Sequence, residues 1–123
     1  MTLQKLILKN FYITRIMTIK TWNIEAITGY KPISTFFEDF SIADQYGTDA
    51  IKDTYERAFD SWKSNYKMLT EFVMALNWKC WQHFEEKNSE YTELYRSLYY
   101  KADDYACNNL CGPELEYYYR TTD

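Results

Sequence analysis

Apolar side chains recur every three or four residues from Ile51 to Phe84 in this chain of 123 residues. The positions are Ile51, Tyr55, Ala58, Trp62, Tyr66, Leu69, Val73, Leu76, Cys80 and Phe84. This is the period of a helix that buries one face, and neither glycine nor proline interrupts it. A single helix of that length would be unusual in a globular protein. We therefore expect a kink or a short break near residues 61–65.

Capping and breaker residues predict the helices on either side. Thr35 and Glu38 form a capping pair that indicates the start of a helix, and Gly47 is expected to end it. Thr48 is the expected N-cap of the long helical region. Residues 18–33 contain two breakers, Gly29 and Pro32, and are predicted to form a short irregular N-terminal segment.

The C-terminal third predicts a hairpin and a last short helix. Ser89 is the expected N-cap of a helix that continues through Leu110, and its length matches that of residues 66–87, as in an antiparallel helical hairpin. Gly112 followed by Pro113 indicates a stop and a new start. The predicted fold is therefore all-α, a compact antiparallel helical bundle with two long helices.

Three consecutive tyrosines lie in the last predicted helix. Tyr117, Tyr118 and Tyr119 step by about 100° each around a helix, so they cannot share one face. We expect one or two to close the end of the bundle and at least one phenol to remain at the surface. A stacking platform for a partner is the less favoured interpretation.

The length indicates one domain, and the charge of the first sixteen residues differs from that of the rest of the chain. The net charge is −4, which argues against non-specific binding to nucleic acid or anionic membrane. Residues 1–16 hold three basic and no acidic residues, and without them 11 basic and 18 acidic residues leave a net charge of −7. We predict a non-native or disordered leader over 1–16, with Met17 as a second start, and a single α-helical domain over 17–123. The alternative is an ordinary basic strand or helix packed on the body.

The localisation expected from the sequence is cytoplasmic. The chain has an odd number of cysteines, three, which is typical of reduced thiols. Its start lacks the uninterrupted apolar stretch and small-residue cleavage site of a signal peptide. No run approaches the roughly 18 apolar residues of a membrane span, so no membrane partner is expected.

The sequence gives little support for a metal site or for nucleophilic catalysis. Cys80, His83, Cys107 and Cys111 resemble a set of zinc ligands. In the expected hairpin, however, Cys80 and Cys107 are offset by about 16 Å along the helices, so we expect no metal site and no cofactor. A Cys80–His83 dyad is conceivable, but nothing near it suggests an oxyanion hole. We therefore expect that the protein is not an enzyme. The thiols are interpreted as small core residues, and His83 as an imidazole on the helix surface.

One face of the predicted helix carries an acidic stripe, formed by Asp49, Asp53, Glu56 and Asp60. These residues lie at steps of four, three and four, within about 60° around the helix and opposite its apolar face. Glu38, Asp39 and Asp44 of the preceding helix are candidates to extend the stripe. Fixed carboxylates at this spacing can imitate a nucleic-acid backbone and dock where a protein grips phosphates. A solvated helix face has the same pattern, and the sequence leaves both interpretations open.

Residues 71–81 are apolar on nearly every side. A helix of this kind is central in its fold or contributes half of an oligomer interface. In a domain this small, two neighbouring helices do not easily bury all its large side chains, so a homodimer is a second hypothesis. Its predicted surface comprises Phe72, Met74, Trp78 and Trp81.

From about Ser34 to its end, the sequence resembles a group of small acidic proteins encoded on conjugative transposons and related mobile elements of gut bacteria. The matching stretches are "TFFEDFSIADQYGTDAIKDTYERAF", "LTEFVMALNWKCWQHFE" and "ELEYYYRTTD". The resemblance implies a context, because mobile elements often carry small acidic proteins that block host restriction or CRISPR nucleases, several of them by mimicking DNA. It implies no catalytic residue and no ligand.

The function expected from these observations is that of a non-catalytic accessory binding protein of a mobile element. It would act on a host nucleic-acid enzyme through the acidic stripe, without contacting nucleic acid directly. The alternative is a structural or regulatory homodimeric module of the element with no nuclease target.

Overall fold

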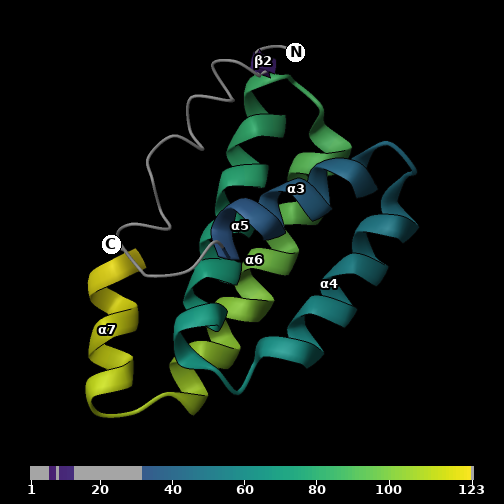
Figure 1. Cartoon of the computed structure of the whole chain (residues 1–123). Coiled ribbons are helices and arrows are strands. Elements are labelled where there is room, and N and C mark those ends of the chain that lie inside the picture. Colours follow the sequence, from purple (N-terminus) through teal and green to yellow (C-terminus); the bar gives the residue numbers. More distant parts are fainter. Residues whose placement is uncertain (1–5, 8, 13–31, 123) are drawn as a thin grey trace.

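The computed structural model describes residues 6–7, 9–12 and 32–122 (Figure 1). Helices make up nearly all of the described part: α3 (Pro32–Asp44), α4 (Thr48–Trp62), α5 (Tyr66–Glu85), α6 (Ser89–Asn109) and α7 (Pro113–Thr122). Two short strands, β1 (Leu6–Ile7) and β2 (Lys9–Tyr12), pair in parallel near the N-terminus. The predicted all-α bundle with two long helices, α5 and α6, is confirmed.

The N-terminal predictions fall mostly outside the described residues. This holds for the start at Met17, for most of the predicted leader over 1–16 and for most of the irregular stretch over 18–33. Where the ranges overlap, the structure places β1 and β2 within 1–16 and begins α3 at Pro32. The helix therefore starts three residues before Thr35, with proline at its first position, where a missing amide hydrogen costs nothing.

The long apolar pattern is broken, as expected, between Trp62 and Tyr66. The chain turns back on itself there, so that α4 and α5 are separate helices (Figure 1). Asn65 begins α5 as its N-cap, because its side-chain oxygen accepts a hydrogen bond from the amide of Met68 at 3.1 Å.

Two predicted N-caps were wrong by one residue. Gly47, not Thr48, precedes α4, and its φ of 110° is a conformation that favours glycine. Asn88, not Ser89, caps α6 and accepts from the amide of Tyr91 at 3.1 Å. Asparagine and serine are both good N-caps, and here the chain turn places the asparagine first.

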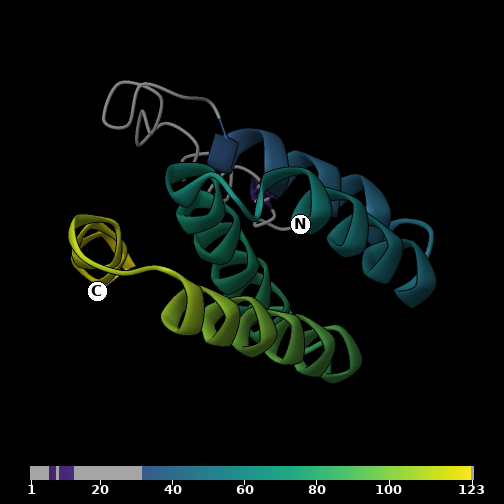
Figure 2. The same ribbon diagram turned by 90° about the horizontal axis from the view of Figure 1, so that it is seen from below.

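Helix α5 lies at the centre of the fold and contacts each of the other four helices. It forms the predicted antiparallel hairpin with α6, while α3 and α4 form a second hairpin that packs against this pair (Figure 2). The short α7 packs against α5 and α6. Of the two possibilities that the apolar character of residues 71–81 left open, the structure shows the central position in the fold.

All five helices contribute to one hydrophobic core. Its largest fully buried apolar side chains are Phe40, Ile51, Tyr55, Phe72, Tyr95 and Tyr118. Phe72 contacts aromatic rings of both α3 and α4, with ring centroids 5.3 Å from those of Phe36 and Tyr55. Among the described helices, none combines the length and the hydropathy needed to cross a membrane.

The three tyrosines of α7 divide between core and surface as predicted. Tyr118 is 1 % exposed and its hydroxyl donates a hydrogen bond to Oδ1 of Asp103. Tyr119 is 47 % exposed, and Tyr117 is intermediate. The tail is thus anchored on α6 through one phenol.

We expect Tyr55→Phe to raise the free energy of unfolding by about 1 kcal/mol. The Tyr55 hydroxyl is buried and has no hydrogen-bond partner among the described residues, and an unsatisfied buried hydroxyl is destabilising. The environment also raises the pKa of this phenol to about 12, mainly through desolvation and then through the charge of Glu56. Urea denaturation of both proteins measures the difference, and a loss of stability of the same size would contradict it.

Candidate functional site

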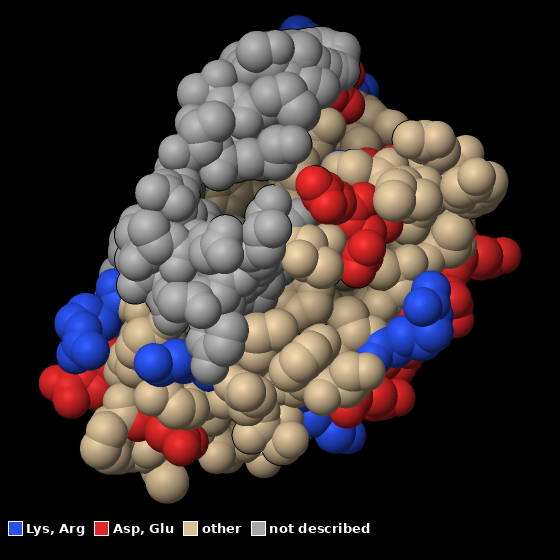
Figure 3. Space-filling model, viewed as in Figure 1, with Lys and Arg blue, Asp and Glu red and all other residues tan. Residues whose placement is uncertain are grey.

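The acidic stripe on α4 is exposed along its whole length. Asp49, Asp53, Glu56 and Asp60 are all exposed, whereas Ile51 and Tyr55 on the opposite side of the helix are buried. In the space-filling view, red acidic and blue basic groups alternate along the edge of the molecule where α4 lies (Figure 3). The stripe is therefore accessible to a partner, but it is interspersed with cations.

Three of the four stripe carboxylates have a basic neighbour. Asp53 accepts a hydrogen bond from Nε of Arg57 at 3.0 Å. Asp60 lies 3.8 Å from Nζ of Lys63, and Glu56 lies 3.8 Å from Nζ of Lys101 on α6. All of these side chains are well exposed, and exposed pairs contribute little stability. A partner that offers better placed cations can replace them at small cost.

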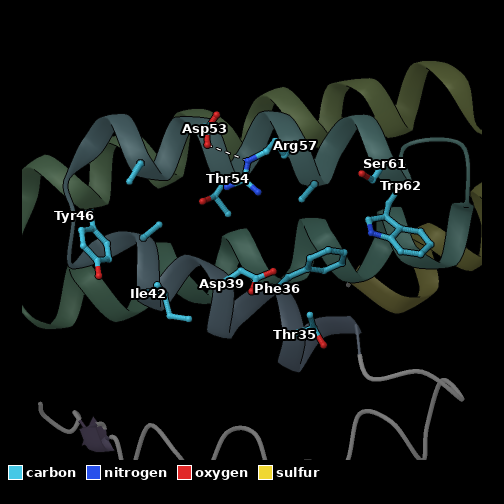
Figure 4. Close-up of a pocket in the computed structure, with 13 residues that line it drawn as sticks. Thr35, Phe36, Asp39, Ile42, Tyr46, Asp53, Thr54, Arg57, Ser61 and Trp62 are labelled. Atoms are coloured by element: carbon cyan, nitrogen blue, oxygen red, sulfur yellow. Dashed lines mark hydrogen bonds and ion pairs between the residues drawn. The ribbon is translucent and has the colours of Figure 1, made fainter.

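A groove of about 480 Å³ runs between α3 and α4, beside the stripe (Figure 4). Its ends are apolar, with Ile42 and Tyr46 at one end and Trp62 at the other. These three side chains are 56 %, 76 % and 39 % exposed, which is high for large apolar residues. Asp39 and Arg57 face the groove between the two ends.

Among the described residues, none forms a hydrogen bond or a close ion pair with the carboxylate of Asp39. Desolvation raises its pKa, and the charge of Arg57 offsets this only in part. Arg57 itself is bonded to Asp53, and among the described residues no side chain donates a hydrogen bond to Asp39. The groove therefore has an acidic centre between two apolar ends.

A second polar cluster is buried beneath α3 and is organised around Lys79. This lysine of α5 is fully buried, and its Nζ donates to Oδ2 of Asp44 at 2.7 Å, Oγ of Ser41 at 3.0 Å and Oε1 of Gln82 at 2.7 Å. Three acceptors match the three protons of an ammonium group. The same nitrogen lies 4.8 Å from the ring centroid of Phe37, which adds a cation–π contact.

Asp44 joins three helices through this cluster. Nε2 of His83 lies 2.8 Å from Asp44 Oδ2, and we assign the ring proton to this nitrogen because an ionised carboxylate only accepts. On α6, the Tyr95 hydroxyl donates to Asp44 Oδ1 at 2.5 Å, and the Tyr91 hydroxyl donates to the Asp44 carbonyl oxygen at 3.2 Å. The end of α3 is thereby fixed to α5 and α6.

The stability of the protein should fall as the pH drops below about 3.8, the ordinary pKa of an aspartate. Burial acts to raise the pKa of Asp44, but Lys79 and His83 together outweigh it and hold the pKa below that value. A carboxyl whose pKa is depressed by folding stabilises the protein above its unfolded pKa, and this contribution is lost as the pH falls through the folded pKa. Thermal unfolding followed from pH 6 to pH 2 measures this fall in stability. Asp44→Asn should show a smaller fall, and identical profiles would contradict the assignment.

The buried cluster corrects two expectations. Asp44 does not extend the acidic stripe, because its side chain is 14 % exposed and faces Lys79. His83 is not a surface imidazole, since it is 4 % exposed and its ring stacks on Tyr95. The sequence did contain a sign that Lys79 and His83 are buried. They follow Phe72 and Leu76 at helical steps, which places all four on the buried face of α5.

The prediction that the thiols are small core residues was wrong for Cys111, which is exposed, while Cys80 and Cys107 are partly buried against the core. Sγ of Cys80 points to the carbonyl oxygen of Thr92 at 3.6 Å, while His83 is engaged by Asp44. Burial raises the pKa of the Cys80 thiol, which disfavours the nucleophilic thiolate. Within the described ranges, no group of three or more His, Cys, Asp or Glu side chains is placed to hold a metal ion.

Only some of the residues predicted to form an oligomer interface are exposed. Phe72 is 1 % exposed and belongs to the core, so it cannot contribute to an interface. Met74 and Trp78 are half-buried against the core. Trp81 is 55 % exposed and forms an edge-to-face pair with Phe84, which the sequence pattern had placed on the buried stripe but which is 56 % exposed.

No family model matches this chain, and comparison with curated proteins and with solved structures finds no significant similarity.

Proposed function

We propose that this chain is a non-catalytic accessory binding protein of a mobile genetic element, acting in the cytoplasm on a host nucleic-acid enzyme such as a restriction or CRISPR nuclease. The observation that carries the proposal is the exposed row of carboxylates on α4, which points away from the core. The mobile-element context rests on the resemblance of residues 34–123 to small acidic proteins of such elements.

The stripe has the physical properties that this role needs. Residues three or four apart on a helix lie about 5 to 6 Å from one another, so the carboxylates form a regular row of negative charge. A nuclease channel that holds phosphates with lysine and arginine is complementary to such a row. Direct binding of nucleic acid is disfavoured by the net charge of −4.

The test is a variant in which the stripe loses its charge. We expect the combined change Asp49→Asn, Asp53→Asn, Glu56→Gln and Asp60→Asn to weaken binding to the nuclease by about thirtyfold, because four exposed charge pairs at about 0.5 kcal/mol each are lost. Inhibition of the nuclease should fall in parallel. Titration calorimetry and a DNA cleavage assay measure the two effects.

A matched control removes the same number of charges elsewhere. Glu90, Glu93, Asp104 and Glu114 are exposed acids on α6 and α7. Their amide variant undergoes the same change in net charge, yet it should retain binding. Equal losses in the two variants would show that only net charge matters and would contradict the proposal.

A homodimeric module of the element is the second candidate function. It is favoured by the exposed Trp81–Phe84 pair, of which Phe84 lines a hollow of about 560 Å³ between the end of α5 and the start of α6. Large exposed aromatic groups of this kind often mark interfaces. Sedimentation over a wide range of concentration tests it, and a monomer at every concentration would remove it.

A further inference from the structure

We propose that the groove between α3 and α4 receives an amphipathic helix of the partner enzyme, which carries a basic side chain between two apolar ones. This inference rests on the proposed function and extends it, because it adds a second contact surface and states the chemistry of the segment that fills it. The following observations on the described residues carry it.

The length of the groove matches about three turns of a helix. Its lining runs from Thr35 on α3 to Tyr46 in the turn that follows, and from Ala50 to Trp62 along α4. At 1.5 Å per residue these stretches span roughly 16 to 18 Å. A helix that enters such a groove uses apolar anchors at positions such as i and i+7, about 10.5 Å apart.

The two ends of the groove provide the apolar contacts for those anchors. Ile42 and Tyr46 form one end, and Trp62 stands at the other. Because the three end residues are more exposed than large apolar side chains usually are, covering them removes apolar surface from water and favours binding.

The centre of the groove is negatively charged and is therefore complementary to a cation. The charged side chains that face it are Asp39 of α3 and the Asp53–Arg57 pair of α4, which leave one net negative charge. Asp39 is partly desolvated and has no direct partner among the described residues. An arginine or lysine from the partner would pair with it through a charge-assisted hydrogen bond, which is stronger than a bond between neutral groups.

A helix fits this chemistry better than an extended strand does. A strand gains most of its affinity by pairing with an exposed sheet edge, and both walls of the groove are helices whose backbone groups are already bonded. Proteins that bind nucleic acid carry clusters of lysine and arginine on one face or along a helix, so the required segment agrees with the partner class proposed above.

The experiment uses the full chain and a synthetic helical peptide with two leucines seven positions apart and one arginine between them. A matched peptide carries glutamate in place of the arginine. We expect the basic peptide to bind and to shift the NMR signals of the Trp62 indole and the Ile42 methyl groups. The acidic peptide should bind at least about tenfold more weakly, since it places like charges together. Equal binding of the two peptides, no binding of either, or shifts confined to another face would overturn the inference.

Variants of the chain sharpen the result. Asp39→Asn should weaken binding of the basic peptide about tenfold, the value of one charge-assisted hydrogen bond. Asp104→Asn, a change of the same kind on the exposed face of α6, should leave it unchanged. If both variants bind like the parent chain, the assigned role of Asp39 is wrong.

The same variants separate this inference from the proposed function. Asp53 belongs to both the stripe and the groove, so the comparison uses Asp39→Asn with Ile42→Ala against Asp49→Asn with Asp60→Asn. Nuclease binding that is lost only with the second pair would overturn the groove inference and leave the proposed function intact. Loss only with the first pair would overturn the stripe and retain the groove.

Discussion

Asp44→Asn is expected to lower the free energy of unfolding by about 3 to 5 kcal/mol. The substitution leaves Lys79 fully buried without its counterion and weakens the contacts of Asp44 with His83 and Tyr95. Removing one partner of a buried ion pair is strongly destabilising, because the remaining charge stays desolvated. Since a domain is commonly stable by only about 5 to 15 kcal/mol, this is a large fraction of the total. The midpoint of urea denaturation reports the change.

Two controls show whether the loss comes from the buried charge. Asp104→Asn makes the same chemical change at an exposed site and should stay within about 0.5 kcal/mol of the parent protein. Adding Lys79→Met to Asp44→Asn removes the orphaned ammonium and should restore part of the stability. A cost below about 1 kcal/mol for Asp44→Asn alone would mean that the cluster is not the ion pair described above.

Phe72→Ala is expected to cost about 3 to 5 kcal/mol, as is usual for a fully buried phenylalanine. The ring is 1 % exposed and lies where α3, α4 and α5 meet. Its centroid is within 6.3 Å of those of Phe36, Phe40, Tyr55 and Phe59. The substitution removes these edge-to-face and tilted contacts and leaves a cavity between the helices. Thermal and urea denaturation both measure the loss.

The matched control for Phe72 lies on the same helix. Phe84 is 56 % exposed, so Phe84→Ala removes the same atoms without opening a cavity and should change stability by no more than about 0.5 kcal/mol. Similar costs for the two substitutions would contradict the burial on which the assignment of the core depends.

The helices could be predicted from the sequence because each buries one face at a regular period. The pattern from Ile51 to Phe84 located both α4 and α5, and the SWKSN stretch marked the break between them. Helix starts were less secure, because neighbouring residues such as Asn88 and Ser89 are both good caps. Which of them has the non-helical backbone of an N-cap depends on the path of the chain in the preceding turn.

The buried polar cluster illustrates what the sequence conceals. Asp44 lies 35 residues before Lys79 and 51 before Tyr95, so no local pattern connects them. Their contact depends on how the α3–α4 hairpin packs on α5 and α6. Lys79 and His83 do fall on the buried face of α5, although His83 was predicted to be a surface imidazole.

The acidic stripe was predicted correctly as a geometric feature. Its four residues share one exposed face of α4, as helical spacing requires. The pairing of Glu56 with Lys101 could not be foreseen, because Lys101 lies on a different helix. The groove beside the stripe was not predicted, since its two walls come from helices whose relative position the sequence does not specify.

The most direct test of the proposed function is capture of the partner from a lysate of a host bacterium. The full chain is immobilised, and bound proteins are identified by mass spectrometry at low and at high salt. We predict recovery of a restriction or CRISPR nuclease that is released as the salt rises, because exposed charge pairs are screened, and that is displaced by duplex DNA. Recovery at both salt concentrations of only the chain itself, or of transfer proteins of a mobile element, would contradict the account.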